Sequence, residues 1–132
     1  MSGSPYAWRA LLALEVKQLK YISRLLEASK GEVKASEYLK LNPRGTVPTI
    51  KDGDIVVRES LAIMAYLDRK YPERPLFGAN AQQVAKAWRL IFEYLSYAYG
   101  PVTRIIAPLY AGKIAENKSD LLCRCTAGPR GA

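Results

Sequence analysis

The residues best suited to binding chemistry lie between positions 42 and 60. Pro48 opens a β-prone run, and because proline cannot donate to a β-ladder, the neighbouring Val47 N–H and C=O are free to pair with an extended ligand. Ser60 stands where a helix N-terminus offers unpaired N–H groups and partial positive charge, which suit a carboxylate. Glu59 beside it could accept an ammonium group. An extended ligand with an α-amino acid head at one end would match both features.

Plain structural roles would explain the same residues without a ligand. Pro48 could belong to an ordinary loop, since X–Pro bonds in folded proteins are cis in only ~5–6% of cases. Glu59 and Ser60 could be an acid and a cap at the start of a helix. Ser4 precedes Pro5, which fits an N-cap with proline at the first helical position. The residues alone leave both kinds of role open.

Composition narrows the classes of partner. The 132 residues carry 20 Lys and Arg against 12 Asp and Glu, and a net charge of +8 favours anionic partners without choosing one. The basic residues are scattered, with no basic block or recognition-helix pattern, so nucleic acid is not a predicted partner. Cys123 and Cys125 are the only cysteines and histidine is absent, which predicts no metal site and excludes histidine-based acid/base catalysis.

The sequence also lacks the marks of a membrane or secreted protein. No stretch approaches ~18 uninterrupted apolar residues, so no membrane span is predicted, and no signal peptide opens the chain. The expected location is the cytoplasm.

The elements that must position these residues follow from apolar spacing. A helix is expected from Ser4 to Leu19, with apolar residues on two faces that should both be buried. A short strand over 20–26 and a short helix over 34–41 should follow. Runs 49–51 and 55–58 flank the turn at Asp52-Gly53-Asp54, which predicts a hairpin, and a helix is expected over 61–71.

The second half of the chain is expected to be helical. Two prolines and a glycine within 72–78 predict a linker, and Asn80 should cap a long helix over 81–99. Gly100-Pro101 should bend or interrupt that helix before it resumes through Leu109. The predicted organisation is therefore a first domain over 1–71, a linker over 72–79, a partial helical domain over 80–120 and a disordered tail over 121–132.

The motif T-V-P at 46–48, followed by a hairpin and by E-S-L-A-I-x-x-Y-L at 59–67, resembles the glutathione-binding half of the glutathione S-transferase family. The resemblance covers roughly Ser4 to Leu109. It implies a mixed α/β chain with a thioredoxin-like N-terminal domain and a cis bond before Pro48. It also implies that Val47 and Pro48 hold the cysteinyl backbone of glutathione, and that Glu59 and Ser60 hold its γ-glutamyl head.

The resemblance further implies a catalytic role for Ser4, because Ser4-Pro5-Tyr6-x-x-Arg9 is similar to the family's catalytic turn. A thiol of pKa ~8.5 is only about 3% ionised at pH 7, and one hydrogen bond from a hydroxyl at a helix N-terminus could stabilise the thiolate enough. Some serine-type members carry a lysine near position 34 that meets the glycyl carboxylate, although a solvated helix-end charge explains Lys34 equally well. No metal is implied.

Two departures from the family pattern matter. Members have a strand before the catalytic turn, whereas only three residues precede Ser4, and their helical domain continues beyond the apolar period seen here. We therefore expect a thioredoxin-like domain lacking most of its first strand, a partial all-α domain, and marginal stability, with a homodimer if the helical domain were complete. The expected function is conjugation of glutathione to a small hydrophobic electrophile. The alternative is a non-catalytic module that binds glutathione weakly or not at all.

Overall fold

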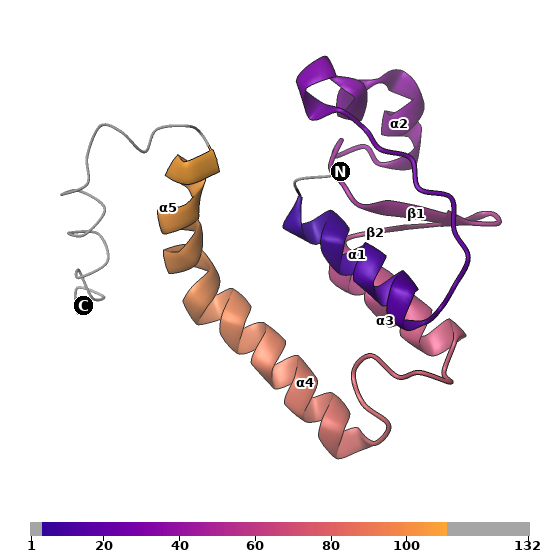
Figure 1. Ribbon diagram of the computed structural model, residues 1–132, viewed down its shortest axis with the longest axis vertical. Helices are drawn as coiled ribbons and strands as arrows, with labels where there is room; N and C mark the ends of the chain where they lie inside the picture. Colours follow the sequence, from indigo (N-terminus) through magenta and orange to yellow (C-terminus); the bar gives the residue numbers. More distant parts are fainter. Residues whose placement is uncertain (1–3, 111–132) are drawn as a thin grey trace. The chain divides into compact units, whose positions relative to one another are not determined.

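The structure is a computed structural model that describes residues 4–110. The chain divides into two compact units between Gly78 and Ala79, and each unit is described here by itself. In the first unit, helix α1 (Pro5–Val16) is followed by the short 3₁₀ helices η1 (Ala28–Lys30) and η2 (Glu32–Lys34) and by helix α2 (Ser36–Leu41). Strands β1 (Thr49–Asp52) and β2 (Ile55–Arg58) then lead into helix α3 (Ser60–Lys70) (Figure 1).

The N-terminal helix begins where the sequence predicted. Ser4 is its N-cap, and its hydroxyl oxygen accepts a hydrogen bond from the Ala7 N–H at 3.4 Å, with proline in the first turn. This side chain satisfies one of the N–H groups that a helix start leaves without an intrahelical partner.

Strands β1 and β2 form a two-stranded antiparallel sheet in which Thr49 pairs with Arg58 and Asp52 with Ile55. Gly53 lies in the two-residue turn with φ +60°, a conformation that glycine adopts without steric cost. Asp52 accepts hydrogen bonds from Lys70 Nζ and from the Tyr66 hydroxyl, so the hairpin turn is tied to the last turns of α3. The Lys70 contact, followed by the Tyr66 contact, holds the pKa of Asp52 below its usual value.

The core of the first unit lies between α1 and α3. Ala10 and Ala13 of α1 are buried against Ile63 and Leu67 of α3, and half-buried residues of the hairpin, Ile50 and Val57, pack against them. Figure 1 shows the two helices side by side. Small residues on α1 let the two helix backbones approach closely, so this contact fixes the start of α1 relative to α3.

A buried ion pair closes the other end of this helix pair. Lys17 is 7% exposed, and its Nζ lies 2.9 Å from Asp68 Oδ1, which also accepts the Leu76 N–H at 2.6 Å. Burial alone would raise the pKa of Asp68, but the hydrogen bonds from the Leu76 amide and from Lys17 outweigh it and lower the pKa.

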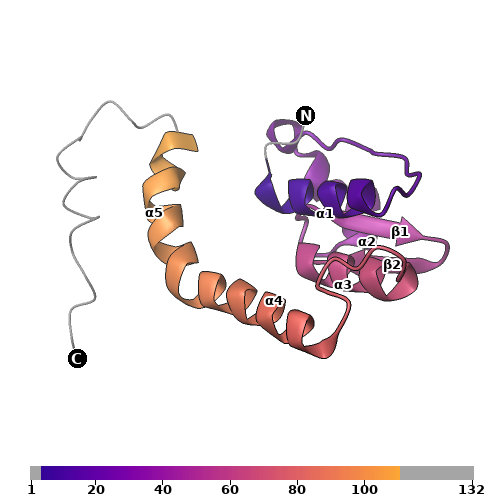
Figure 2. The same ribbon diagram turned by 60° about the horizontal axis from the view of Figure 1, so that its bottom comes forward.

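The second unit is helical over its described part. Helix α4 (Ala81–Glu93) is capped by Asn80, whose side chain accepts the Gln83 N–H at 2.9 Å. A π-helical turn (Tyr94–Ala98) follows, and helix α5 (Tyr99–Tyr110) continues the chain. Figure 2 shows that the axis changes direction between α4 and α5. The predicted interruption therefore lies one turn before Gly100-Pro101, because Pro101 has no N–H and its ring crowds the carbonyl four residues earlier.

Three expectations about the first unit were wrong, two about secondary structure and one about the burial of α1. The segment 20–26 forms no strand, and Ile22 is 91% exposed. A strand needs a neighbour for its ladder, and within residues 4–110 the sheet consists of β1 and β2 alone. The helix expected over 34–41 begins at Ser36, with Lys34 in the preceding 3₁₀ turn.

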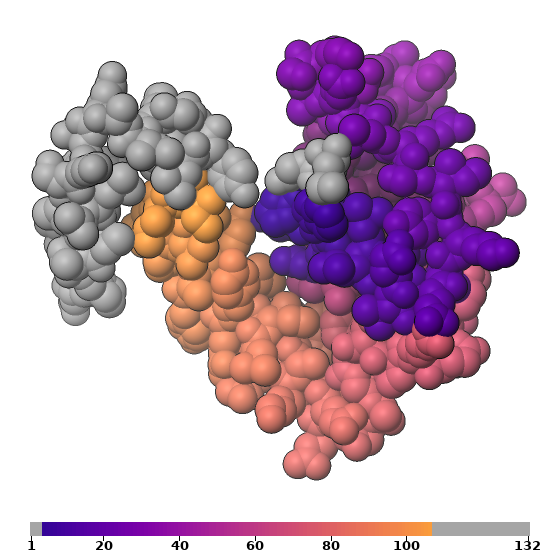
Figure 3. All heavy atoms as spheres, viewed as in Figure 1, coloured from indigo at the N-terminus to yellow at the C-terminus, as the bar shows by residue number. Residues whose placement is uncertain are grey.

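The second face of α1 is also not buried as expected. Trp8, Leu12 and Val16 are 39%, 58% and 53% exposed. The space-filling view shows α1 and the segment after it, coloured indigo to violet, on the surface of the first unit (Figure 3). Apolar spacing reports a face that can be buried, and it does not say which neighbour is present to bury it.

Among the described helices, none is long and apolar enough to cross a membrane. The predicted tail over 121–132, with Cys123 and Cys125, lies outside the described residues.

Candidate functional site

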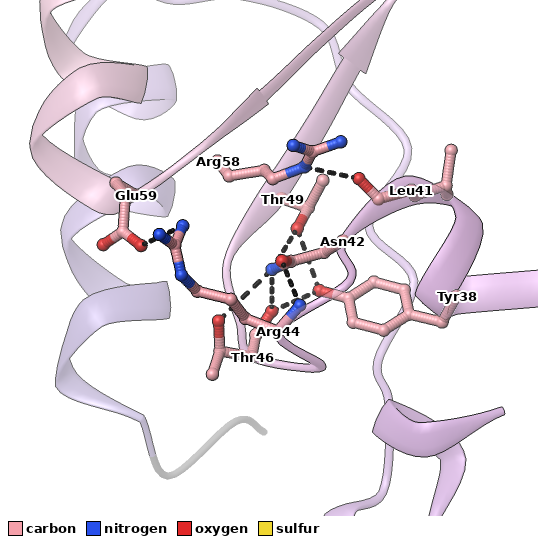
Figure 4. A network of polar contacts seen from close by, with 8 residues as sticks. All are labelled: Tyr38, Leu41, Asn42, Arg44, Thr46, Thr49, Arg58 and Glu59. Atoms are coloured by element: carbon pink, nitrogen blue, oxygen red, sulfur yellow. Dashed lines mark hydrogen bonds and ion pairs between the residues drawn. The ribbon is translucent and has the colours of Figure 1, made fainter. Parts of the chain in front are cut away.

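The loop between α2 and β1 is organised by one buried amide. Asn42 is 1% exposed, and its Nδ2 donates to the Thr46 carbonyl at 2.7 Å and to the Thr46 and Thr49 hydroxyls at 3.2 Å each. Its Oδ1 accepts the Arg44 N–H at 3.2 Å. Figure 4 shows these contacts converging on Asn42. The Asn42 side chain therefore supplies hydrogen-bond partners for polar groups along the whole turn, which fits its position just after a helix end and just before Pro43.

Two further side chains fix the same loop. The Tyr38 hydroxyl donates to the Thr46 carbonyl at 2.6 Å and lies 2.9 Å from the Thr49 hydroxyl oxygen. Arg58 Nε donates to the Leu41 carbonyl at 2.6 Å, which joins the end of β2 to the end of α2 (Figure 4). Tyr38 of α2 thus holds the segment that leads into β1, and Arg58 of β2 holds the end of α2 from which that segment departs.

Lys34 lies against this loop. Its Nζ donates to the Arg44 carbonyl at 3.1 Å, and a Cβ built on Gly45 would lie 2.8 Å from that Nζ and 2.6 Å from the Val33 carbonyl oxygen. Gly45 also has φ +60°. The close approach of the Val33 carbonyl, together with the positive φ, therefore requires glycine at position 45.

The peptide bond between Val47 and Pro48 is cis, the isomer that the sequence prediction named. Val47 and Pro48 are half-buried and lie just before β1. Within residues 4–110, no hydrogen bond is found for the Val47 N–H or C=O. The main chain next to Pro48 can therefore pair with an extended ligand.

Glu59 and Ser60 stand at the start of α3 but differ in their surroundings. Glu59 is the N-cap with φ 67° and ψ 120°, its side chain makes no capping bond, and its carboxylate lies 3.7 Å from Arg44. A non-glycine residue in that conformation is strained, and strain of this kind clusters at ligand sites. Ser60 is 5% exposed, and Ile63 is the first residue whose N–H reaches the cap carbonyl, at 2.9 Å.

Arg9 connects α1 to this helix start. Its Nη1 donates to Ser60 Oγ at 3.0 Å, and its guanidinium lies over the Tyr6 ring, 5.6 Å from the ring centroid. Ser4 is the N-cap of the same helix, so the positions of Ser4 and Arg9 relative to each other are fixed by α1.

The structure links the predicted site residues through arginines that were not assigned a role from the sequence. Lys34 and Glu59 both contact Arg44, and Ser60 contacts Arg9. Asn42 and Tyr38, which hold the loop, were also missed. The Asn-Pro pair after a short helix was the available signal for Asn42. The motif Ser4-Pro5-Tyr6-x-x-Arg9 included Arg9 without giving it a contact, and nothing local to Tyr38 indicates the contacts that the fold creates.

Two arginines lie at the start of α3, where Arg9 contacts Ser60 and Arg44 lies 3.7 Å from Glu59, and the first N–H groups of the helix carry partial positive charge. Lys34 contacts the carbonyl of Arg44. Glu59 supplies one negative group at the edge. Within the described residues, no group of three or more His, Cys, Asp or Glu side chains could hold a metal ion.

Comparisons with known proteins identify the architecture. The family model "Glutathione S-transferase, N-terminal domain" matches residues 3–70. "Glutathione S-transferase 1" of Dianthus caryophyllus is 45% identical over 84 residues, which are 64% of this chain and 38% of that protein. "Glutathione S-transferase Z1" of Arabidopsis thaliana is 47% identical over 93 residues, which are 70% of this chain and 42% of that protein.

The solved structures agree with this similarity. The crystal structure of a glutathione S-transferase from the Antarctic clam Laternula elliptica matches with a TM-score of 0.78 and 39% identity, over 93% of this chain and 56% of that chain. The chain thus spans about two fifths of the two plant relatives and just over half of the clam protein. The predicted mixed α/β class is confirmed, with a small antiparallel sheet and helices that match a thioredoxin-like unit.

Proposed function

The chain belongs to the glutathione S-transferase family, and from this premise we propose that its first unit binds glutathione and activates the thiol for conjugation to a small hydrophobic electrophile. The observation that carries the proposal is the start of α3. There a strained Glu59 and a buried Ser60 place an acceptor for an ammonium group beside a donor for a carboxylate. An α-amino acid head, such as the γ-glutamyl end of glutathione, needs both.

The γ-glutamyl head would bind between Glu59 and Ser60. The Glu59–Arg44 pair joins side chains that are 68% and 72% exposed, and such exposed pairs contribute little to stability. A ligand ammonium group could therefore replace Arg44 beside Glu59 at small cost. Ser60 and the first N–H groups of α3 would receive the carboxylate.

The cysteinyl residue would pair with the main chain at Val47 and Pro48. Two main-chain hydrogen bonds to an extended ligand fix its direction and leave its side chain pointing to one face. Since Asn42 and Tyr38 hold Thr46 and Thr49 on either side, the pairing groups are positioned before the ligand arrives.

Lys34 would meet the glycyl carboxylate at the other end of the tripeptide. Its ammonium group has three donors, of which one is directed to the Arg44 carbonyl. The remaining donors and the exposed position of Lys34 suit a carboxylate that stays partly in solvent.

Ser4 would act on the thiol. The capping bond from Ala7 uses a lone pair of Ser4 Oγ, so capping and donation of the hydroxyl proton are compatible. A shift of ~2 units in the thiol pKa requires about 2.7 kcal/mol, which one hydrogen bond to a charged acceptor, at ~1.5–3 kcal/mol, can supply together with the helix N-terminus. The thiol proton would pass to solvent, and the thiolate would attack the carbon that carries the leaving group. A C–S bond would form as the bond to the leaving group breaks, with release of chloride in the case of a chloronitrobenzene.

The test combines binding and turnover. Calorimetric titration of the full chain with glutathione should show binding, and Ser60→Ala should weaken it by ~1–3 kcal/mol, as expected for loss of a hydrogen bond to a charged group. A chloronitrobenzene should be conjugated by the wild-type chain and more slowly by Ser4→Ala. Absence of glutathione binding in the wild-type chain would refute the proposal.

A non-catalytic binding module is the alternative, and the same experiment separates it. Such a module would bind glutathione weakly or not at all and would show no conjugation above the uncatalysed rate.

A further inference from the structure

The connection between α1 and η1 contains a run of main-chain groups without partners. Residues 20–26 form no helix or strand, and within the described chain none of their N–H or C=O groups takes part in a hydrogen bond. All of these residues except Leu26 are exposed. In Figure 1 the segment runs between α1 and η1 without a helical turn. A run of free N–H and C=O groups at a surface can pair with another strand.

The side chains of this segment favour a strand and offer apolar surface. Its sequence, Lys-Tyr-Ile-Ser-Arg-Leu-Leu, contains an aromatic and a β-branched residue and lacks proline and glycine. Tyr21, Ile22 and Leu25 are 40%, 91% and 53% exposed. The Tyr21 hydroxyl donates to the Glu15 carboxylate at 2.7 Å, so the beginning of the segment is held against α1. In the space-filling view, α1 and this segment lie on one face of the first unit (Figure 3). An added strand would therefore cover apolar side chains as well as pair with main-chain groups.

We propose that residues 20–26 pair with the same residues of a second copy of this chain, as two antiparallel strands related by a two-fold axis at Ser23. A two-fold interface uses one patch twice, so the patch must complement itself. Pairing over the whole segment places these residues opposite one another: Ser23 and Ser23, Tyr21 and Leu25, Ile22 and Arg24, Lys20 and Leu26. On one face, two pairs of tyrosine and leucine flank the central serines, and apolar pairs across an antiparallel ladder stabilise it.

The charges of the segment favour this register over its neighbours. In a symmetric pair each side chain lies on the same face in both copies, so the axis must pass at a residue and not between two residues. A centre at Ile22 would place Lys20 opposite Arg24, and a centre at Arg24 would place that arginine opposite itself. Like charges directly opposite each other are destabilising, whereas a centre at Ser23 places no two charges opposite. Among these three registers, the segment complements itself in one.

A solvated connection is the competing explanation, and it predicts that this segment makes no contact between copies. Two strands this short bury less than the roughly 1,200 Å² of a stable interface, so the pairing should be weak, with a Kd of about 10–500 μM. Association is measured by sedimentation equilibrium of the full chain over a concentration range that brackets this Kd, with a thermal melt of each variant.

The first variants block main-chain pairing. Consecutive residues of a strand direct their N–H groups to opposite edges, so one of the two variants Ser23→Pro and Arg24→Pro must remove a hydrogen bond from the paired strands. That variant should weaken association at least about tenfold, since a symmetric pair loses the bond in both copies. Ser23→Ala and Arg24→Ala keep the N–H and should associate within about threefold of the wild-type chain. The melting temperatures of all four variants should stay close to that of the wild-type chain, because no described residue pairs with these N–H groups.

The second test reads the register and needs no proline. In a chain that carries Cys123→Ser and Cys125→Ser, the substitution Ser23→Cys places the two new thiols opposite each other, with Cβ atoms about 4.5–5.5 Å apart, close enough for a disulfide after a small shift. Lys20→Cys is the matched control, because the two copies of residue 20 would lie about 20 Å apart along the paired strands. Under the same oxidant, Ser23→Cys should form the covalent dimer at least about tenfold faster than Lys20→Cys.

A wild-type chain that stays monomeric over this concentration range would overturn the inference and would leave the edge to a strand of a different protein. Association that neither proline variant weakens would place the contact elsewhere in the chain and would also overturn it. Equal rates of covalent dimer formation in the two cysteine variants would do the same. None of these measurements involves glutathione, so a failure of this pairing and a failure of the proposed function are distinguishable.

Discussion

Replacement of Asn42 by alanine should be the most damaging single change in the loop that leads to β1. Its side chain makes one hydrogen bond of 2.7 Å and three of 3.2 Å, and it is 1% exposed. The alanine variant loses all four contacts and leaves the Arg44 N–H without its acceptor. The Thr46 carbonyl and the Thr49 hydroxyl each keep a partner, because the Tyr38 hydroxyl contacts both, whereas the Thr46 hydroxyl loses its contact with Asn42.

The magnitude follows from those contacts. The short bond to the Thr46 carbonyl and the lost acceptor of Arg44 count at about 1 kcal/mol each, and the two longer bonds to hydroxyls at about half as much, which gives a loss of about 3 kcal/mol. Asn80→Ala is the matched control. It removes the same side chain from an exposed helix cap with one bond of 2.9 Å and should cost about 1 kcal/mol.

The assay is thermal and urea unfolding of the wild-type chain, Asn42→Ala and Asn80→Ala, followed by titration of each with glutathione. Asn42→Ala should lower the melting temperature by about 4–8 °C for each kcal/mol lost, and should weaken glutathione more than Asn80→Ala does. A stability loss for Asn42→Ala within about 0.5 kcal/mol of the control would show that the buried network does not hold the loop, and the reasoning above would fail.

Three further predictions concern other parts of the first unit. Ser4→Ala should raise the pKa of bound glutathione's thiol while leaving affinity within a few-fold, and thiolate absorbance that titrates at the same pH in both proteins would contradict this role. Gly45→Ala should destabilise the first unit by more than about 1 kcal/mol in urea unfolding, because residue 45 has φ +60° and its new Cβ would lie 2.6 Å from the Val33 carbonyl oxygen. An unchanged free energy of unfolding would mean that the loop can move aside. Because the pKa of Asp68 is lowered in the folded state, this carboxylate stabilises the fold at pH values above the ordinary carboxyl pKa, and the stabilisation should be lost as the pH falls below about 4. Asp68→Asn should remove that part of the acid dependence and should lower the free energy of unfolding by about 3 kcal/mol at neutral pH, as measured by urea unfolding at a series of pH values.

Local signals in the sequence predicted the elements that carry the candidate site. Ser4-Pro5 marked the start of α1, the Asp-Gly turn marked the hairpin, and β2 has the predicted bounds Ile55–Arg58. These features depend on neighbours within a few residues along the chain, which is why residue types and spacing are sufficient to place them.

Features that depend on distant partners were not predicted. The segment 20–26 has the composition of a strand, but no described strand lies beside it to complete a ladder. The contacts of Arg9 with Ser60 and of Lys17 with Asp68 each join positions 51 apart in the sequence. Such pairs are created by the packing of α1 on α3, and no periodic pattern encodes which polar residues will meet.

The packing of these two helices is therefore the step on which the candidate site depends. The sheet has two strands in the described part of the chain, so the position of Ser4 and Arg9 relative to Ser60 is set mainly by Ala10 and Ala13 against Ile63 and Leu67. The buried pair of Lys17 and Asp68 fixes the far end of the same contact. A larger residue at Ala10 or Ala13 would push α1 away from α3 and separate the hydroxyl proposed for the thiol from the groups proposed for the carboxylate. The small residues of α1 thus let this helix pack closely on α3, and the proposed binding of one ligand to the starts of both helices depends on that packing.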